Sequence, residues 1–374
     1  MKEVTIYQTD AGQKVSRYLN VLLPGAGSGF LFKMLRKKNI LVNNKKATGN
    51  EILKAGDTLQ IYFSDETYEK FSTGATGDRS GASEKPGKVS AIKDPVQRLS
   101  DYHKAFRELG SISVVYEDEH ILILNKPAGL LSQKAKAGDL SVNEWMIGYL
   151  LSKGALTAEQ LNTFIPSVCN RLDRNTSGLI LCGISLQGSR FLSAILKDRS
   201  LHKFYTATVH GAVQNAFYAT GIITKDKKKN ISVVTDITKK ILSDNRSDTL
   251  ITESEALFSE TDKEERIATA CRPIRSGKRY GEDITDLEIL LLTGKSHQIR
   301  SHFKALGHPL FGDFKYETRS QRADDAKILA KGKDTHIQNL CAYRLVFPGD
   351  LPEPFQYLSA KEFKVNADME IQRS

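Results

Sequence analysis

The sequence predicts an α+β protein whose main domain holds a mixed, largely antiparallel sheet flanked by helices, with a smaller domain in front. Three observations support this fold class. The chain has 374 residues, which is enough for two folded units. Its composition becomes polar and rich in small residues after residue 64. Further along, apolar segments of strand length outnumber amphipathic helical segments, and several strands follow one another without a helix between them.

The bulk composition narrows the class of partner and the cellular setting. Lysine and arginine number 54 and aspartate and glutamate 44, so the net charge of +10 favours a polyanionic partner. The four cysteines form no Cys-x-x-Cys pair, so we expect a reducing, cytoplasmic setting without a disulfide framework. The longest apolar runs stay below the roughly 18 residues of a membrane span. No metal-binding tract is evident in the sequence.

The small domain contains a helical segment with two different faces. At residues 30–38, apolar residues recur at helical spacing on one face and basic residues on the other. A strand at 40–42, an Asn43-Asn44 turn and a second strand at 59–63 follow. The basic residues on the helix face and after the turn, called here the N-terminal basic set, are Lys33, Arg36, Lys37 and Lys45.

This order of elements resembles the S4 RNA-binding module, with Val42-Asn43 and Gly56-Asp57 as its best points of match. The resemblance implies that the small domain binds RNA. The N-terminal basic set would then neutralise phosphates, which supplies affinity and positioning without reading bases. The alternative is a small basic domain whose charges are only solvated.

Between the domains, residues 65–105 are predicted to be a flexible linker. Few bulky apolar residues follow Phe71, so this stretch buries too little surface to offset its ordering entropy. The expected boundaries are therefore 1–64 for the small domain, 65–105 for the linker and 106–374 for the large domain.

The large domain opens with a strand and two helix starts. A continuous apolar run predicts a buried strand that ends in a turn at 125–129. Ser141 with Glu144 three residues later is the pattern of a capping box, and apolar residues after it give the helix a buried face. Thr157 with Gln160 repeats the pattern before a short helix.

A charged loop at residues 170–178 precedes the apolar strand 179–183. Arg171 and Arg174 flank Asp173 in this loop. Alone, such a pattern is more often a surface ion pair that stabilises by under about 1 kcal/mol. An acid on a tight loop before a core strand is nevertheless held firmly and still reaches a cleft, which suits a catalytic group.

The remaining pattern predicts further strands and helices in the large domain. We expect a helix at 189–199, a strand at 203–209, a polar insertion at 243–265, a buried strand at 287–292 and a helix at 296–306.

Five blocks of the large domain, in this order, resemble the RluA family of RNA pseudouridine synthases. The blocks are 126–129, 170–178, 203–211, 292–300 and 307–313. Their Arg-Leu-Asp-Arg and Thr-Gly-Lys-Ser-His-Gln-Ile-Arg sequences are highly specific. The resemblance implies the isomerisation of uridine, in which the glycosidic C–N bond breaks, the uracil turns and C5 bonds to the same sugar carbon. It implies neither a cofactor nor a metal.

The resemblance also implies the reacting group and its neighbour. Asp173 would be the catalytic carboxylate, which either attacks the sugar C1′ or promotes loss of the base through a glycal. Lys295 would be the adjacent cation that favours the ionised carboxylate, at a position where the family usually has arginine. Both routes for Asp173 stay open at this stage.

Other site residues follow from the same resemblance. Tyr205 matches an active-site tyrosine whose ring stacks on the detached uracil. Arg171 matches a residue that helps to extrude the target base into the pocket. Arg174 and Arg300 are expected to contact phosphate or to support the structure.

The expected partner is structured RNA, with large-subunit ribosomal RNA as the first choice, because an S4 module in front of such a domain is a common pairing. A transfer RNA synthase of the same family would share every catalytic residue. A non-catalytic RNA-binding or ribosome-assembly factor on the same scaffold is the alternative from another functional class. We expect the protein to be a monomer.

Overall fold

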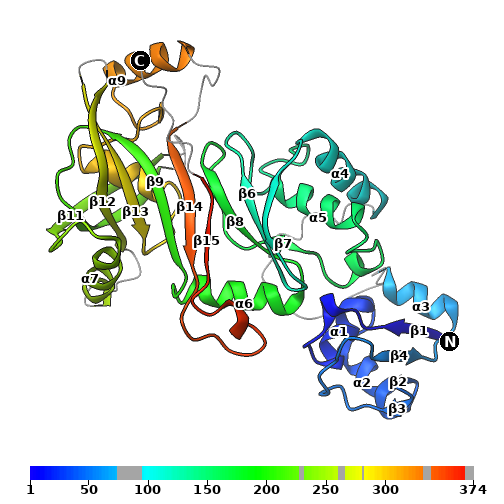
Figure 1. The fold of residues 1–374 in the computed structure, drawn as a ribbon. Helices are drawn as coiled ribbons and strands as arrows, with labels where there is room; N and C mark the ends of the chain where they lie inside the picture. Colours follow the sequence, from blue (N-terminus) through cyan, green and yellow to red (C-terminus); the bar gives the residue numbers. More distant parts are fainter. Residues whose placement is uncertain (74–94, 227–230, 260–265, 280–281, 332–337, 367–374) are drawn as a thin grey trace. The chain divides into compact units, whose positions relative to one another are not determined.

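The computed structural model describes residues 1–73, 95–226, 231–259, 266–279, 282–331 and 338–366 (Figure 1). The chain forms two compact units. The first unit comprises residues 1–123, 133–169 and 181–193, and the second comprises 124–132, 170–180 and 194–374. Three elements contribute residues to both units, namely β6 (Ile121–Lys126), β8 (Ser177–Gly183) and α6 (Leu186–Lys197).

The first unit begins with a small N-terminal subdomain. Its elements are β1 (Lys2–Thr5), η1 (Gln8–Asp10), α1 (Val15–Leu22), α2 (Ser28–Arg36), β2 (Ile40–Val42), β3 (Lys45–Lys46) and β4 (Thr58–Ile61). The strands pair in the order β1-β4-β2-β3. Leu31, Met34 and Leu35 of α2 lie in the subdomain core, whereas the N-terminal basic set is exposed. The predicted two-faced helix is therefore confirmed.

The turn between β2 and β3 is fixed by asparagine side-chain and backbone geometry. Asn43 and Asn44 both have positive φ angles, 50° and 60°, which is the conformation of a tight type I′ hairpin turn. The Asn43 side chain donates to the Asp57 carboxylate at 2.8 Å and accepts from the backbone N–H of Thr58 at 2.8 Å. These bonds hold the basic hairpin tip against the start of β4.

A helix, α3 (Asp65–Ser72), occupies the start of the predicted linker 65–105. Its Phe71 ring centroid lies 5.0 Å from that of Phe30, so this helix packs on the N-terminal subdomain. The prediction of a linker is wrong here, because one aromatic residue on a short capped helix buries more surface than the polar composition suggests. Residues 74–94 of the predicted linker lie outside the described residues.

The end of the predicted linker is also helical. Helix α4 (Pro95–Glu108) buries Tyr102 and Ala105 and packs against α5 (Val142–Ser152), where Gly148 leaves room for the Tyr102 carbonyl. A few apolar residues at helical spacing suffice to bury one face of a helix. The prediction was based on average composition, which does not detect such spacing.

Of the two predicted capping boxes, only the second forms. The Ser141 hydroxyl donates to the Glu144 carboxylate rather than accepting from the backbone, although α5 does start there. At the second site the backbone N–H of Thr157 donates to the Gln160 side chain at 2.7 Å, and the Gln160 N–H donates to the Thr157 hydroxyl at 3.3 Å. The other elements of this unit are β5 (Ser113–Glu117), η2 (Gln160–Asn162) and β7 (Ser167–Val168).

The second unit is built on a strongly antiparallel sheet (Figure 1). Its strands are β9 (His202–His210), β10 (Phe217–Asp226), β11 (Ile231–Ile241), β12 (Arg266–Arg279), β13 (Glu282–Leu291), β14 (Leu340–Val346) and β15 (Glu362–Lys364). They pair antiparallel in the order β11-β10-β12-β13-β9-β14, with β15 also on β14. The first residues of β8 pair with β14 in parallel. This confirms the predicted α+β class with a mixed, largely antiparallel sheet.

Helices cover both faces of this sheet. Phe217 and Tyr218 are neighbours on β10, so their side chains point to opposite faces. Tyr218 packs with Leu250 of α7 (Ser247–Ser259), and the Phe217 ring lies 6.2 Å from that of Phe303 on α8 (Gln298–Ala305). Helix α7 lies within the polar stretch 243–265, and the sequence analysis did not expect a helix there. The charged side chains in the described part of this stretch are exposed or partly exposed. The remaining elements of the unit are α9 (Arg319–Lys331) and η3 (Gln356–Leu358).

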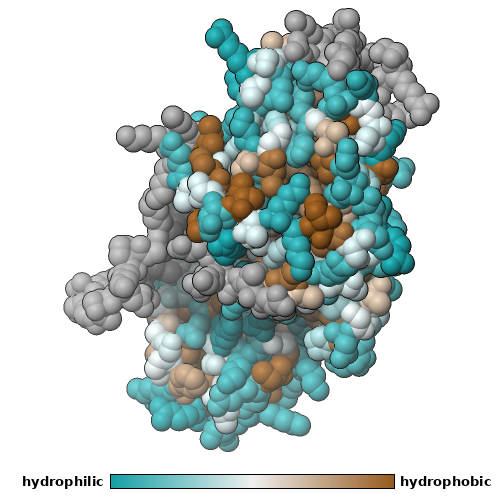
Figure 2. All heavy atoms as spheres, turned by 90° about the vertical axis from the view of Figure 1, so that its left-hand side faces the viewer, coloured by the Kyte–Doolittle hydropathy of each residue, from teal (hydrophilic) through white to brown (hydrophobic). Residues whose placement is uncertain are grey.

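Figure 2 shows the side of the molecule on which β11 lies in Figure 1, and hydrophobic residues appear there as separate spots among hydrophilic ones. Strand β11 ends the strand order and carries the exposed apolar residues Val233 and Ile241 beside the exposed Lys239 and Lys240. Single apolar residues are ordinary at a protein surface, and lysines on an edge strand oppose pairing with another chain.

Among the described residues, none of the helices combines the length and the apolar character needed to cross a bilayer.

Candidate active site

Asp173 lies on the loop between β7 and β8, within the second unit. Its carboxylate is 28% exposed, and its Oδ2 lies 2.8 Å from Nη1 of Arg300. The neighbours Arg171 and Arg174 are both exposed, whereas Leu172 between them is buried. The buried Leu172 therefore anchors the loop. The Asp173 carboxylate, which pairs with the Arg300 guanidinium, stays partly exposed at the surface.

Arg300 connects Asp173 to a second acid. Its Nε and Nη2 donate to the two oxygens of Asp313, each at 2.7 Å, while Nη1 serves Asp173. Burial alone would lower the pKa of Arg300, but hydrogen bonds and charge from Asp313 and then Asp173 outweigh it and raise that pKa. The guanidinium is thus a permanent, three-point positive charge beside Asp173.

The predicted pairing of Lys295 with Asp173 is replaced by that of Arg300. Lys295 is exposed, and its backbone N–H donates to the Gln298 side chain at 3.1 Å. His297 has a left-handed backbone, with φ of 56°, and begins α8. One turn further along, Arg300 is carried to Asp173. Arg300 was expected to contact phosphate or support the structure, and the structure shows it in ion pairs with Asp173 and Asp313.

The Gln298 side chain stabilises this turn from inside the unit. Its oxygen accepts from the Thr293 hydroxyl at 2.8 Å and from Lys295, and its amide donates to the Ala268 carbonyl and the Thr269 hydroxyl, each at 3.0 Å. All the capacity of this buried amide is used. The block that contains Gln298 therefore orients α8, and with it Arg300.

Tyr205 is the third predicted catalytic residue and lies on β9, between β13 and β14. Its side chain is buried. Burial first and then the negative charge of Asp173 raise the pKa of Tyr205, so its hydroxyl keeps its proton. Tyr205 thus lies close enough to Asp173 for the charge of that carboxylate to affect its pKa.

His297 also stands beside Asp173, with Tyr316 next to His297, and the sequence analysis gave neither residue a role. The Tyr316 hydroxyl accepts from the Ser232 N–H at 2.9 Å and lies 2.9 Å from Nδ1 of His297. The single hydroxyl proton is therefore free to go to Nδ1, which leaves an N–H on Nε2, 3.9 Å from Oδ2 of Asp173. Burial lowers the pKa of His297, and Asp173 offsets only part of this effect, so the imidazole is neutral.

Lys315 is a further cation in the surroundings of Asp173. It is half-buried, and burial first and the charge of Arg300 next lower its pKa, whereas Asp173 acts in the opposite direction. Lys315 therefore adds positive charge near Asp173 and Arg300.

Lys126 is the principal residue whose role the sequence analysis missed. Its side chain is fully buried, and Nζ donates to the carbonyls of Pro127 at 3.0 Å, Leu130 at 2.9 Å and Arg174 at 3.0 Å. Burial, the largest effect, lowers the pKa of Lys126 to about 8, while Asp173 acts to raise it. This ammonium joins the turn after β6 to the loop of Asp173.

Two further contacts hold the same loop. The Ser132 hydroxyl donates to the Leu172 carbonyl at 2.8 Å and accepts from the Leu172 N–H at 3.0 Å. At the start of β8, Gly178 has a φ of 109°, and a Cβ built there would lie 2.2 Å from the Ala342 carbonyl oxygen. Only glycine fits this backbone contact with β14. Asp173 is therefore positioned by backbone contacts on both sides of its loop.

The N-terminal basic set lies in the first unit, exposed on α2 and the β2–β3 hairpin. Metal-type ligands come together at one place among the described residues, at His210, Glu317 and Asp325, which are considered below.

Comparison with known proteins identifies a family. Residues 120–305 match the family model described as RNA pseudouridylate synthase. "Ribosomal large subunit pseudouridine synthase C" of Rickettsia bellii (strain RML369-C) is 29% identical over 334 residues, which cover 89% of this chain and 91% of that protein. The protein of the same description from Escherichia coli (strain K12) is 27% identical over 325 residues, covering 85% and 81%.

Solved structures give a weaker likeness. The human RNA Pseudouridylate Synthase Domain Containing 1 aligns at 20% identity with a TM-score of 0.46, covering 71% of this chain and 93% of that chain. The matched residues 120–305 include Lys126, Asp173, Tyr205 and Arg300, which are four of the groups that build the site described above. The prediction of a pseudouridine synthase is confirmed, and residues 120–305 of the chain match the RNA pseudouridylate synthase family.

Proposed function

We propose that this protein converts uridine to pseudouridine in large-subunit ribosomal RNA, with Asp173 as the catalytic carboxylate. The observation that carries the proposal is the partly exposed Asp173 carboxylate, paired with Arg300 inside the matched residues. Ribosomal RNA is supported by the names of the relatives, which are similar to this chain over most of their length. Residues 106–374 are proposed as the catalytic domain.

In the proposed reaction no atom is gained or lost by the RNA. Asp173 bonds to C1′ as the C–N bond breaks, or it promotes formation of a glycal by loss of the base. The free uracil turns and C5 bonds to C1′, as the bond from Asp173 to C1′ breaks in the first route or as the proton lost in forming the glycal returns to the sugar in the second. The C5 proton then leaves and N1 takes up a proton, so the composition of the RNA is unchanged. A permanently charged Arg300 suits either route, because it stabilises the ionised carboxylate of Asp173, which both routes require.

The neighbours of Asp173 take distinct roles in this proposal. The raised pKa of Tyr205 makes its hydroxyl a hydrogen-bond donor rather than a base, and its ring is the surface on which uracil stacks. Arg171, exposed beside Asp173, is proposed to fill the gap left by the extruded nucleotide. Arg174, Lys295 and Lys315 are proposed as phosphate contacts, since Arg300 already provides the ion pair that Lys295 was expected to make.

The N-terminal subdomain is proposed to bind RNA as an S4-like module, with residues 1–64 as its extent. Its support is the exposed basic set on α2 and the hairpin tip, which Asn43 and Asp57 hold in place. A cytoplasmic location and a monomeric state stay predictions. The described cysteines are free, and three of the four are buried, as a reducing compartment allows.

The deciding experiment replaces Asp173 by Asn and maps pseudouridine in total RNA from cells that carry the wild type, the variant or no copy of the gene. We expect D173N to abolish one set of ribosomal pseudouridines while RNA affinity in vitro stays within a factor of about two. Asp236→Asn is the matched control, because Asp236 also pairs with an arginine but is 60% exposed.

Each outcome of this experiment has a definite meaning. Normal pseudouridine in the D173N strain refutes the catalytic assignment. Loss of transfer RNA pseudouridine, with ribosomal RNA unchanged, replaces the proposed substrate by the alternative one. Identical maps with and without the gene point to the non-catalytic RNA-binding factor.

A further inference from the structure

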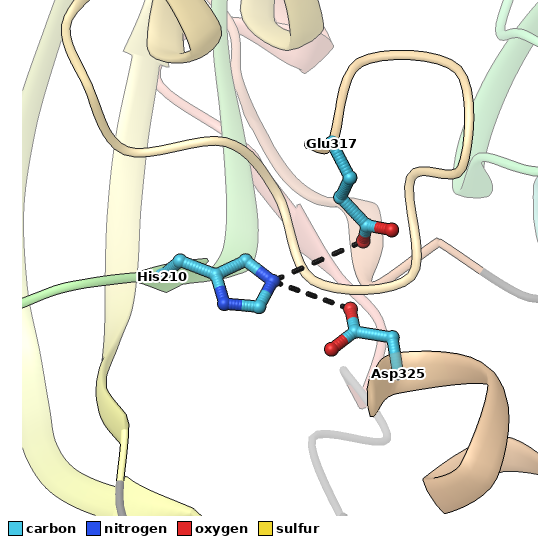
Figure 3. Close-up of side chains that lie close together, drawn as sticks. All are labelled: His210, Glu317 and Asp325. Atoms are coloured by element: carbon cyan, nitrogen blue, oxygen red, sulfur yellow. Dashed lines mark hydrogen bonds and ion pairs between the residues drawn. The ribbon is translucent and has the colours of Figure 1, made fainter. Parts of the chain in front are cut away.

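Three side chains of the second unit point toward one another at the end of β9 (Figure 3). Nε2 of His210 lies 3.2 Å from Oδ2 of Asp325 and 3.9 Å from Oε1 of Glu317. The side chains are 6%, 2% and 0% exposed, respectively. His210 ends β9, Glu317 lies on the loop after Tyr316, and Asp325 lies on α9. One imidazole and two carboxylates thus share a buried site.

Glu317 is the least satisfied member of this group. Neither of its carboxylate oxygens has a hydrogen-bond partner among the described residues, although both are buried. By contrast, Oδ2 of Asp325 accepts from the Gly312 N–H at 2.7 Å. Burying a carboxylate is costly unless hydrogen bonds, an ion pair at short range or a metal replace its water. A cation bound directly by the Glu317 oxygens would remove this cost.

The imidazole of His210 is oriented as a metal ligand would be. Its Nδ1 faces Oε2 of Glu282 at 3.5 Å, while Nε2 faces the two buried carboxylates. A carboxylate that receives the Nδ1 proton leaves the lone pair on Nε2, and this arrangement is the usual support of a metal-binding histidine. Within the part of the chain that the structure describes, Nδ1 has no hydrogen-bond partner, and a small approach by Glu282 would supply one.

We propose that His210, Glu317 and Asp325 bind one divalent transition-metal ion, of the kind represented by Zn²⁺ and Mn²⁺. Two ligands about 2.1 Å from a shared ion lie at most about 4.2 Å apart, and both measured separations from Nε2 meet this limit. The ligand atoms all lie within 4.8 Å of one another, so the closing movement is small. Nitrogen and carboxylate ligands suit this class of ion.

The sequence predicted no metal site, and the structure explains why the pattern was invisible. The ligands come from a strand, a loop and a helix, with no short spacing between His210 and the two acids. The ion is structural in this proposal and takes no part in the isomerisation, so the inference does not depend on the proposed function. Its effect is to clamp the segment from Gly312 to Asp325 against β9. That segment contains Asp313, which holds Arg300.

The test measures metal binding by the full-length protein after chelation and dialysis. ZnCl₂ and MnCl₂ are titrated separately, and we expect one equivalent of ion to bind and to raise the thermal midpoint. Glu317→Gln removes a ligand and should weaken binding at least 100-fold. Glu282→Gln removes only the support of His210 and should weaken it about 10- to 100-fold. Glu255→Gln, which breaks the surface pair of His202 and Glu255, is the control and should bind as the wild type does.

Two safeguards keep the result interpretable. The folding of each metal-free variant is checked by circular dichroism, and Asp325→Asn repeats the experiment if E317Q does not fold, because its amide oxygen still accepts from Gly312. Mn²⁺ bound to the wild type is examined by pulsed electron paramagnetic resonance, in which coupling to one histidine nitrogen is expected. The proposal is overturned if the wild type binds neither ion, if a folded E317Q binds as tightly as the wild type, or if bound Mn²⁺ shows no histidine nitrogen. Each of these results would mean that His210, Glu317 and Asp325 share a proton and bind no metal ion.

Discussion

Replacing Arg300 by Lys tests whether a three-point guanidinium, rather than a positive charge alone, keeps Asp173 competent. Arg300 makes two hydrogen bonds to Asp313 and one to Asp173, all between 2.7 and 2.8 Å. An ammonium reaches only one of these carboxylates at a time, so two charged hydrogen bonds are lost. At 1.5–3 kcal/mol each, the free energy of unfolding should fall by about 3 to 6 kcal/mol.

The activity should fall for a separate reason. In R300K the lysine ammonium can pair either with Asp313, which is the more buried acid, or with Asp173. We expect it to stay with Asp313, which leaves Asp173 without its neighbouring charge and lowers the single-turnover rate of pseudouridine formation by about 100-fold. The assay is performed with enzyme in excess over RNA, at a temperature where the variant is fully folded.

Arg344→Lys supplies the matched control. Arg344 is buried to a similar degree and bridges Glu288 at 2.9 Å and Glu362 at 3.2 Å, on another part of the unit. R344K should therefore lose stability while keeping the single-turnover rate of the folded enzyme. A wild-type rate in folded R300K would refute the reasoning, since a charge alone would then suffice. An equal loss of rate in R344K would show that the assay reports stability.

Two further predictions concern Lys126 and the N-terminal basic set. Because the pKa of Lys126 is lowered to about 8, the unfolded chain holds a proton that the folded protein releases between about pH 8 and 10.5. Stability of the wild type relative to Lys126→Met should therefore rise by up to about 3 kcal/mol across that window, which chemical denaturation at several pH values measures; a flat difference would contradict it. Replacing the N-terminal basic set by alanine should reduce the slope of log affinity against log salt by up to about 4 in RNA-binding titrations, and an unchanged slope would remove these residues from the interface.

The sequence predicted those elements of the candidate site that a local sequence pattern specifies. The Asp173 loop, the strand of Tyr205 and the two-faced helix α2 follow from short blocks or from periodicity, and the structure has them. The sequence analysis missed the role of Arg300 because Lys295 and Arg300 are two cations only five residues apart. The left-handed backbone at His297 determines which of them reaches Asp173. No propensity scale contains that turn, since it depends on the buried bonds of Gln298.

Long-range contacts account for the other differences. Lys126 was recognised only as part of a block, and its bond to the Arg174 carbonyl joins residues that are far apart in the chain. The ends of the predicted linker are helices because Phe71 and Tyr102 find partners in other segments. Average composition describes what a segment can bury by itself, and it does not describe what neighbouring segments offer.

The backbone contact at Gly178 affects how precisely the loop of Asp173 is positioned. The loop and β14 approach until backbone meets backbone, with Ala342 in the space where a side chain of residue 178 would be. A spacing defined in this way has no rotamer to change, no proton to lose and no counterion to exchange. The contact between Gly178 and Ala342 therefore fixes the distance between the loop and β14. The position of the loop should be the same across salt and pH conditions that alter the charged contacts around it.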